Sequence, residues 1–453
     1  MKQFPKQTAL TILMVGCLLA AAPFTVPRLP RFPVSELAAL VDFTPEKTPL
    51  LPLIAHVPET PPIPLPRPVL PAKVRKAPVS QVSALLDDSN NSLDQFYAAL
   101  RRTEHGDAGA VTRIVHYGDS PTTADLITGD TRVMLQQRFG DAGHGFVLIA
   151  KPWAWYEHRG VELSGSGWQM LPASRFEARD GLFGLGGVSF TGSDSAHTEI
   201  KFRDPTQSRF ELYYLKQPGG GTITISADGR LIESVDTTSE AKAAGFYPFP
   251  VEGGASRIEL RPHGNIRLFG ITAEKPATGV VYDSLGLNGA SVRVMTHIFK
   301  AQHWTEQLRH RDPNLVIVNY GTNEADFAEF VDHGYEPELR EAIRRIRAAV
   351  PEASILVMSP MDRGRRSGIG DIETMDTIPR IVEIQRRVAK ETGCAFFDTF
   401  AAMGGAGTMA RWYNAQPRLV SADLIHPYPA GGKQIAEVFV REIEAGFARF
   451  KLR

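Results

Sequence analysis

Short apolar runs alternate with amphipathic segments along much of the chain. An amphipathic segment, SLDQFYAALRRTE, spans residues 92–104, and the apolar runs after it are RIVHY (113–117), GVVYDSLG (279–286), NLVIVNYG (314–321), ASILVMSP (353–360) and GCAFFDTF (393–400). Amphipathic segments separate the last three runs, and in one of them Leu339, Ile343, Ile346 and Val350 share a helical face. Buried strands that alternate with surface helices predict an α/β domain whose mostly parallel sheet is covered on both faces.

The pattern changes between residues 156 and 280. Short runs of alternating apolar and polar residues occur there, separated by Gly, Asp and Pro: HTEIKF (197–202), RFELYYL (209–215), GTITISADGRLIESV (221–235) and SRIELRP (256–262). Such spacing is typical of an antiparallel β-sandwich. We therefore predict an α/β domain in two parts, 81–155 and 281–453, interrupted by an inserted β-module at 156–280.

The N-terminal 80 residues predict an export signal and a spacer. Lys2 and Lys6 precede a stretch that carries no charge until Arg28, which is the pattern of a signal peptide or membrane anchor over residues 1–26. Pro23 disfavours cleavage after Ala22, and the apolar run is long enough to span a bilayer, which favours an uncleaved anchor in the inner membrane. Residues 27–80 form a Pro-rich linker. We expect an exported protein in the periplasm or cell envelope.

Charge and cysteine content narrow the function classes. Lys and Arg total 50, as do Asp and Glu, so no overall field attracts nucleic acid or anionic lipid. The two cysteines, Cys17 and Cys394, lie in very different segments, which excludes a Cys-rich metal site. Any chemistry must use other residues.

Polar residues follow the ends of the predicted parallel strands, where active sites of such sheets lie. Ser120 follows the first strand, Gly289 the second and Asn323 the third, and Asp423 and His426 stand three residues apart near the C-terminus. A serine hydroxyl becomes a nucleophile when a histidine accepts its proton and an acid fixes that histidine's tautomer. The N–H groups of Ser120 and Gly289 and the amide of Asn323 would stabilise the oxyanion. This chemistry requires no metal or organic cofactor.

These motifs resemble the four blocks of the SGNH (GDSL) hydrolase family, in family order: GDS, a glycine after the second strand, GTNE and DLIH. The resemblance covers about 81–153 and 281–453, and it implies a flavodoxin-like three-layer α/β/α fold. It also implies that Ser120 is the nucleophile, His426 the base and Asp423 its partner, with Gly289 and Asn323 in the oxyanion hole. Glu324 departs from the family's third block, which usually ends in Asp. We assign the role of orienting His426 to Asp423 rather than to Glu324.

The export signal, the inserted module and the motif sequences are most similar to those of bacterial peptidoglycan O-acetylesterases. This likeness implies a serine esterase that removes O-acetyl groups from an acylated cell-envelope glycan. Two alternatives remain open, namely an O-acyltransferase that modifies an envelope polysaccharide and a non-catalytic envelope-binding protein. Each motif alone also has a structural interpretation, because Gly-Asp-Ser is common in turns and an aspartate can cap a helix.

Three further residues are candidates for substrate binding. Trp153 and Trp155 could stack on sugar rings, although aromatic side chains more often pack in cores or between domains. Arg363 belongs to the arginine-rich segment MDRGRRSG (361–368), which could meet an acidic glycan or form a solvated loop. His116 lies within a predicted strand, and we expect a structural role for it.

Overall fold

The five apolar runs form one sheet. The computed structural model describes residues 85–175, 180–368 and 370–453. The strand order is β1 (Leu86–Asp87), β19 (Ala395–Phe397), β16 (Ser354–Met358), β15 (Leu315–Asn319), β2 (Val111–Gly118) and β14 (Gly279–Gly286). All neighbours pair in parallel except the short edge strand β1, which is antiparallel to β19. The predicted flavodoxin-like α/β sheet is thus confirmed.

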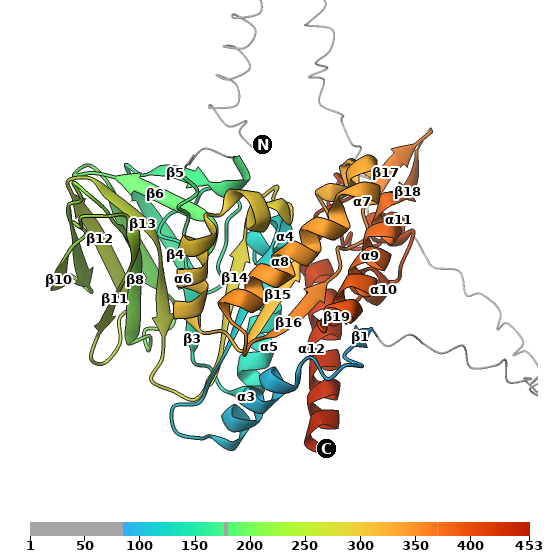
Figure 1. Ribbon diagram of the computed structural model, residues 1–453, viewed down its shortest axis with the longest axis horizontal. Helices are drawn as coiled ribbons and strands as arrows, with labels where there is room; N and C mark the ends of the chain where they lie inside the picture. The colour runs from blue at the N-terminus through green and yellow to red at the C-terminus, as the bar shows by residue number, and fades with distance from the viewer. Residues whose placement is uncertain (1–84, 176–179, 369) are drawn as a thin grey trace, which may run out of the picture. The chain divides into compact units, whose positions relative to one another are not determined.

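Helices cover both faces of this sheet (Figure 1). One layer comprises α3 (Asp94–His105), α5 (Thr128–Phe139) and α12 (Pro429–Lys451), and the other comprises α6 (Ala301–Arg311), α8 (Tyr335–Ala349) and α9 (Thr377–Glu391). Successive strand residues point to opposite layers: Ile114 and Ile317 pack with the first layer, and Val115 and Val316 with the second. The remaining helical segments are short: α4 (Ser120–Thr123), η1 (Ala173–Arg175), η2 (Val294–Ile298), η3 (Glu324–Asp326), α7 (Ala328–His333), α10 (Thr399–Ala402) and α11 (Thr408–Asn414).

The inserted module consists of two antiparallel sheets, as the alternating pattern predicts. One sheet has the order β10 (Arg230–Asp236), β9 (Thr222–Ala227), β12 (Arg257–His263), β7 (His197–Phe202) and β4 (Val161–Ser166). The other has the order β11 (Ala243–Pro250), β8 (Arg209–Lys216), β13 (Ile266–Glu274), β6 (Val188–Gly192) and β5 (Gln169–Pro172). In addition, β3 (Gly143–Val147) pairs with β13. A strand that precedes the predicted boundary at residue 156 therefore belongs to the module's sheet.

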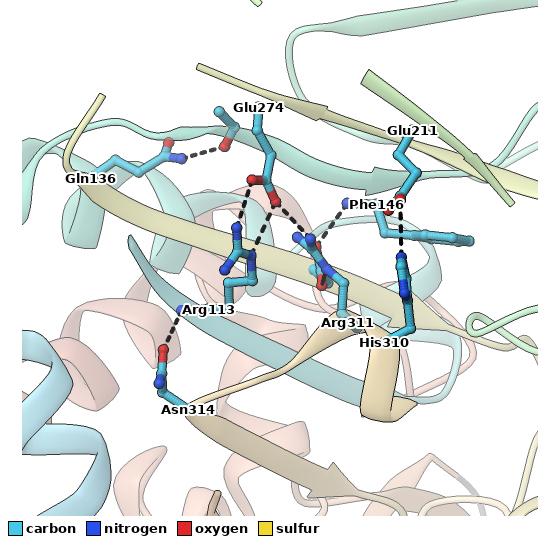
Figure 2. Close-up of polar contacts among 10 residues, drawn as sticks. Arg113, Gln136, Phe146, Glu211, Glu274, His310, Arg311 and Asn314 are labelled. Carbon is cyan, nitrogen blue, oxygen red and sulfur yellow. Dashed lines mark hydrogen bonds and ion pairs between the residues drawn. The ribbon is translucent and has the colours of Figure 1, made fainter. Parts of the chain in front are cut away.

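Ion pairs join Glu274 of the module to Arg113 and Arg311 of the α/β domain (Figure 2). The buried Arg311, at the end of α6, donates to both carboxylate oxygens of Asp283 on β14, at 2.6 and 3.0 Å, and to Glu274 on β13 at 2.6 Å. The N–H of Phe146 on β3 also donates to Asp283, at 2.7 Å. Burial raises the pKa of Glu274, but Arg311 and Arg113 outweigh this effect and hold the pKa at about 2. Charged side chains on α6, β2, β13 and β14 thus hold one another in place.

The arginine-rich segment after β16 forms one strand of a hairpin, on which Arg365 and Arg366 are exposed to solvent. Strand β17 (Gly364–Ser367) pairs with β18 (Asp371–Thr374) in antiparallel register. The guanidinium of Arg366 lies 5.1 Å from the centre of the Tyr413 ring, and Arg365 pairs with Asp376 at 3.5 Å.

The described residues contain no helix that is both long and apolar enough to cross a membrane. The predicted export segment, 1–26, and the Pro-rich linker, 27–80, lie outside the described residues.

Candidate active site

The nucleophile candidate Ser120 lies where β2 gives way to α4. Strand β2 ends at Gly118, and the helix begins at Ser120 with Pro121 in its first turn, a position where the fixed φ of proline suits a helix start. Gly118 has a close neighbour there, since a Cβ at this position would lie 2.2 Å from Oγ1 of Thr122. Because Ser120 opens the helix, its N–H has no partner within the helix and remains available as a donor.

A hydrogen-bonded relay runs from Ser120 to the C-terminal motif. Nε2 of His426 lies 2.7 Å from Oγ of Ser120, and Nδ1 of His426 lies 2.7 Å from Oδ2 of Asp423. Both distances are those of strong hydrogen bonds. His426 lies 306 positions after Ser120 in the sequence, and Asp423 lies close to His426. The fold therefore brings the three side chains together in the geometry that activates a serine hydroxyl.

Local bonds fix the orientation of Asp423. Its Oδ1 accepts the N–H of Ile425 at 2.9 Å, the N–H of His426 at 3.1 Å and the hydroxyl of Ser421. Partial burial raises the pKa of Asp423, but the hydrogen bonds from Ser421, His426 and the backbone outweigh it and lower the pKa to about 2. Asp423 is therefore ionised at neutral pH, and it holds the proton of His426 on Nδ1, which leaves Nε2 free to accept the serine proton.

The loops that follow β14 and β15 begin beside Ser120. Gly118 pairs with Gly286 at the end of β14 and with Asn319 at the end of β15. Gly289 and Asn323, the two predicted oxyanion donors, lie on these loops and line one cavity of about 290 Å³. Nδ2 of Asn323 donates one proton to the carbonyl of Ala290 at 2.7 Å, which fixes the amide and leaves its second proton available.

Glu324 connects the same two loops. Its Oε1 accepts the N–H of Val292 at 2.8 Å, and its Oε2 accepts the N–H of Gly321 at 3.0 Å. Burial raises the pKa of Glu324 to about 7, and the charge of Asp119 adds to the rise. Since both oxygens bind backbone N–H groups, Glu324 supports the oxyanion loops, and the acid that contacts His426 is Asp423.

A family model of GDSL-like lipases and acylhydrolases matches residues 267–434, which include Gly289, Asn323, Asp423 and His426. A solved structure of a peptidoglycan O-acetylesterase is similar with a TM-score of 0.68 and 25% sequence identity, over 81% of this chain and 99% of that chain. Together these two matches support the assignment of the chain as an SGNH (GDSL) hydrolase, which is a carboxylic ester hydrolase.

Two other solved structures are much less similar to this SGNH hydrolase. A Bacillus subtilis protein has a TM-score of 0.32 and 12% identity, over 62% of this chain and 90% of that chain. A family two carbohydrate esterase from Clostridium thermocellum, solved in complex with cellohexaose, has a TM-score of 0.27 and 12% identity, over 63% of this chain and 98% of that chain. These scores are too low to bear on function. The curated proteins include no match to this sequence.

The three predicted substrate-binding residues of this SGNH hydrolase differ in their exposure and in their hydrogen-bond partners. Trp153 is only 4% exposed and belongs to the hydrophobic core, which corrects the prediction that its ring faces a sugar. Trp155 is 50% exposed, and its indole N–H donates to Oδ1 of Asn288 at 3.3 Å. Arg363 donates to the carbonyl of Thr322 at 2.5 Å and pairs with Asp326 at 2.8 Å, so its guanidinium is engaged beside the Asn323 loop.

The role of Glu324 could not be read from the sequence motif. Its two partners come from different loops, and one of them, Val292, is 32 positions away. The available signal was its place directly after Asn323, where the family pattern also has an acid.

Proposed function

We propose that this hydrolase is an exported O-acetylesterase that acts on an acylated glycan of the cell envelope, such as peptidoglycan. The relay of Ser120, His426 and Asp423 carries the proposal, because its two 2.7 Å contacts join a nucleophile, a base and an ionised partner. The similarity to a peptidoglycan O-acetylesterase supports the choice of substrate. The basic, then apolar N-terminal sequence supports export.

The reaction follows from the positions of these groups. Oγ of Ser120 attacks the acetyl carbonyl carbon while Nε2 of His426 takes the hydroxyl proton. The N–H groups of Ser120 and Gly289 and the second amide proton of Asn323 stabilise the oxyanion. His426 then gives its proton to the departing sugar oxygen, which leaves an acetyl-enzyme. A water molecule, activated by the same histidine, releases acetate and restores Ser120.

Acetate release tests this function directly. The full-length protein should release acetate from O-acetylated peptidoglycan, and a serine-directed phosphonate should add one label at Ser120 and stop the reaction. Ser120→Ala should take no label and lose activity by about three orders of magnitude or more. Labelling at a different serine, or full activity of Ser120→Ala, would refute the assigned nucleophile. Transfer of the acetyl group to a bare glycan in place of water would indicate an acyltransferase.

A further inference from the structure

Three aromatic side chains are exposed on the described surface. Phe327 is 64% exposed, Trp155 50% and Tyr428 43%, whereas every other described Trp, Tyr and Phe is buried or half-buried. Large aromatic side chains usually lie in cores, where their burial contributes most to stability. Single exposed apolar residues are common and need no explanation, but each of these three adjoins a predicted catalytic group.

Phe327 lies next to the oxyanion donors. It follows η3, four positions after Asn323, and it lines the 290 Å³ cavity together with Gly289, Asn323 and Phe330. When the carbonyl oxygen of an ester reaches the oxyanion donors, the Phe327 ring therefore lies beside that ester in the same cavity.

Trp155 lies next to the other oxyanion loop. Its indole N–H donates to Asn288, which directly precedes Gly289, at 3.3 Å. This bond limits rotation of the indole ring and leaves one half of the side chain exposed.

Tyr428 lies next to the catalytic histidine candidate. It is two positions after His426, and it caps the N-terminus of α12. Its own N–H donates to the carbonyl of Leu419 at 2.8 Å, which anchors the backbone beneath the exposed ring. Each of the three exposed rings is thus attached to a loop that carries one part of the ester-cleaving machinery.

The distribution of the rings indicates the shape of the ligand. A long acyl chain would need one deep apolar tunnel, but these rings stand on three separate loops. The cavity that Phe327 lines measures about 290 Å³, at the small end of ligand pockets, which typically measure about 300–1,000 Å³. A sugar ring has an apolar C–H face that packs on an aromatic ring and a polar edge that stays in water. Several sugar rings in a chain match several separate aromatic faces.

We propose that Trp155, Phe327 and Tyr428 bind different rings of one glycan chain, so that the enzyme removes acetyl groups from within a chain in preference to free acetylated sugars. The proposal rests on the proposed O-acetylesterase function and names the class of its substrate as an oligomer or polymer. The small ester group then enters the oxyanion hole, while the sugar rings on either side of the acetylated sugar pack on the aromatic side chains and supply most of the binding energy.

The number of sugar rings in the substrate is the variable that tests the proposal. The full-length protein would be assayed for kcat/KM on nitrophenyl acetate and on 6-O-acetylated N-acetylglucosamine oligomers of one, three and five rings. Aromatic contacts of this kind contribute about threefold to tenfold each, so kcat/KM should rise at least about tenfold from one ring to five. Phe327→Ala, Trp155→Ala and Tyr428→Ala should each lose about threefold to tenfold more on the five-ring substrate than on nitrophenyl acetate.

Leu231→Ala is the matched control. Leu231 lies on β10 of the module, is 68% exposed, and is therefore an apolar surface residue away from the strand ends that carry Ser120. The Leu231→Ala variant should leave kcat/KM unchanged on all four substrates. Binding of the unreacted oligomers to Ser120→Ala, measured by calorimetry, should tighten with length and weaken in Ser120→Ala/Phe327→Ala.

The outcomes separate this inference from the proposed function. Equal kcat/KM on one and five rings would overturn the inference and leave the acetylesterase function standing, as would equal losses of the three variants on all substrates. Hydrolysis of nitrophenyl acetate without hydrolysis of any acetylated sugar would overturn the proposed function itself. A preference for nitrophenyl esters of long acyl chains over acetate would show that the rings receive lipid, and would overturn both.

Discussion

Replacing Glu324 by Gln isolates the contribution of one buried acid to both activity and stability. The substitution keeps the size of the side chain and one carbonyl oxygen, but it turns an NH2 group toward one of the two N–H groups, on Val292 and Gly321, that the carboxylate accepts. A buried N–H that loses its acceptor costs about 1–3 kcal/mol, and the loop that carries it shifts to find another partner. The loops concerned hold Gly289 and Asn323.

The expected kinetic effect is on turnover. Deletion of one oxyanion donor typically costs about 10²–10³ in kcat, so a displaced donor should cost less, about tenfold, with KM little changed. Asp423→Asn should be far more damaging, because Asp423 contacts His426 directly at 2.7 Å. Glu329→Gln, at an exposed acid on the next helix, is the control and should leave kcat unchanged.

The expected effect on stability has a defined sign. The folded pKa of Glu324 is about 7, above its ordinary value of 4.5, so folding opposes its ionisation. The wild type therefore loses stability as pH rises from about 4.5 through 7, by about 1.4 kcal/mol for each unit of the shift, or roughly 3 kcal/mol at pH 8. Glutamine does not ionise, so this loss is absent in the variant. At pH 4 the variant should be less stable than the wild type by about 1–3 kcal/mol, the cost of the N–H that lacks an acceptor. From pH 4 to pH 8 the variant should gain roughly 3 kcal/mol relative to the wild type.

Urea unfolding from pH 4 to 8, combined with kcat and KM on nitrophenyl acetate, measures both effects. A variant that is less active, and whose stability relative to the wild type rises between pH 4 and pH 8, is the expected result. The reasoning fails if Glu324→Gln keeps full kcat, or if the difference in unfolding free energy between the two proteins does not change with pH.

Three other predictions concern the relay, the oxyanion hole and the junction with the module. Asn323→Ala should lower kcat by about 10²–10³ with little change in KM, and a loss confined to KM would mean that Asn323 only binds substrate. Asp423→Asn should lower kcat at neutral pH by about three to four orders of magnitude while circular dichroism shows an intact fold, and a loss below tenfold would remove Asp423 from the triad. Arg311→Met leaves the carboxylates of Asp283 and Glu274 without their shared cation, and it should lower the free energy of unfolding by about 3–5 kcal/mol, whereas a loss below about 1 kcal/mol would contradict the ion-pair account.

Much of the fold could be predicted from apolar runs, and the exceptions have physical causes. Strand β13 was not predicted from the sequence. It is buried along its whole length, and its residues therefore do not alternate between apolar and polar. Strand β11 contains Pro248 and Pro250, which normally argue against a strand, but it lies at the edge of its sheet, where proline is tolerated.

The candidate site was predictable where the chemistry depends on residue type and order. Ser120, Asp423 and His426 were found because a serine nucleophile needs a histidine and an acid, and the short spacing of the last two makes their contact local. Trp153 and Trp155 are two positions apart in one segment, and only tertiary packing decides that the first is buried and the second exposed. The same holds for Arg363, whose partners Thr322 and Asp326 lie on a different loop.

The pairing of β3 with β13 bears on whether the module could be removed from the α/β domain. A cassette added to a finished domain would leave the host's own strands paired among themselves, and it could be removed again by a single deletion. Here β3, which precedes the predicted boundary at residue 156, pairs within the module's sheet, and its Phe146 N–H donates to Asp283 on β14 of the α/β domain. Deletion of residues 156–280 would therefore remove the pairing partner of β3, and the two parts are mechanically coupled through this strand.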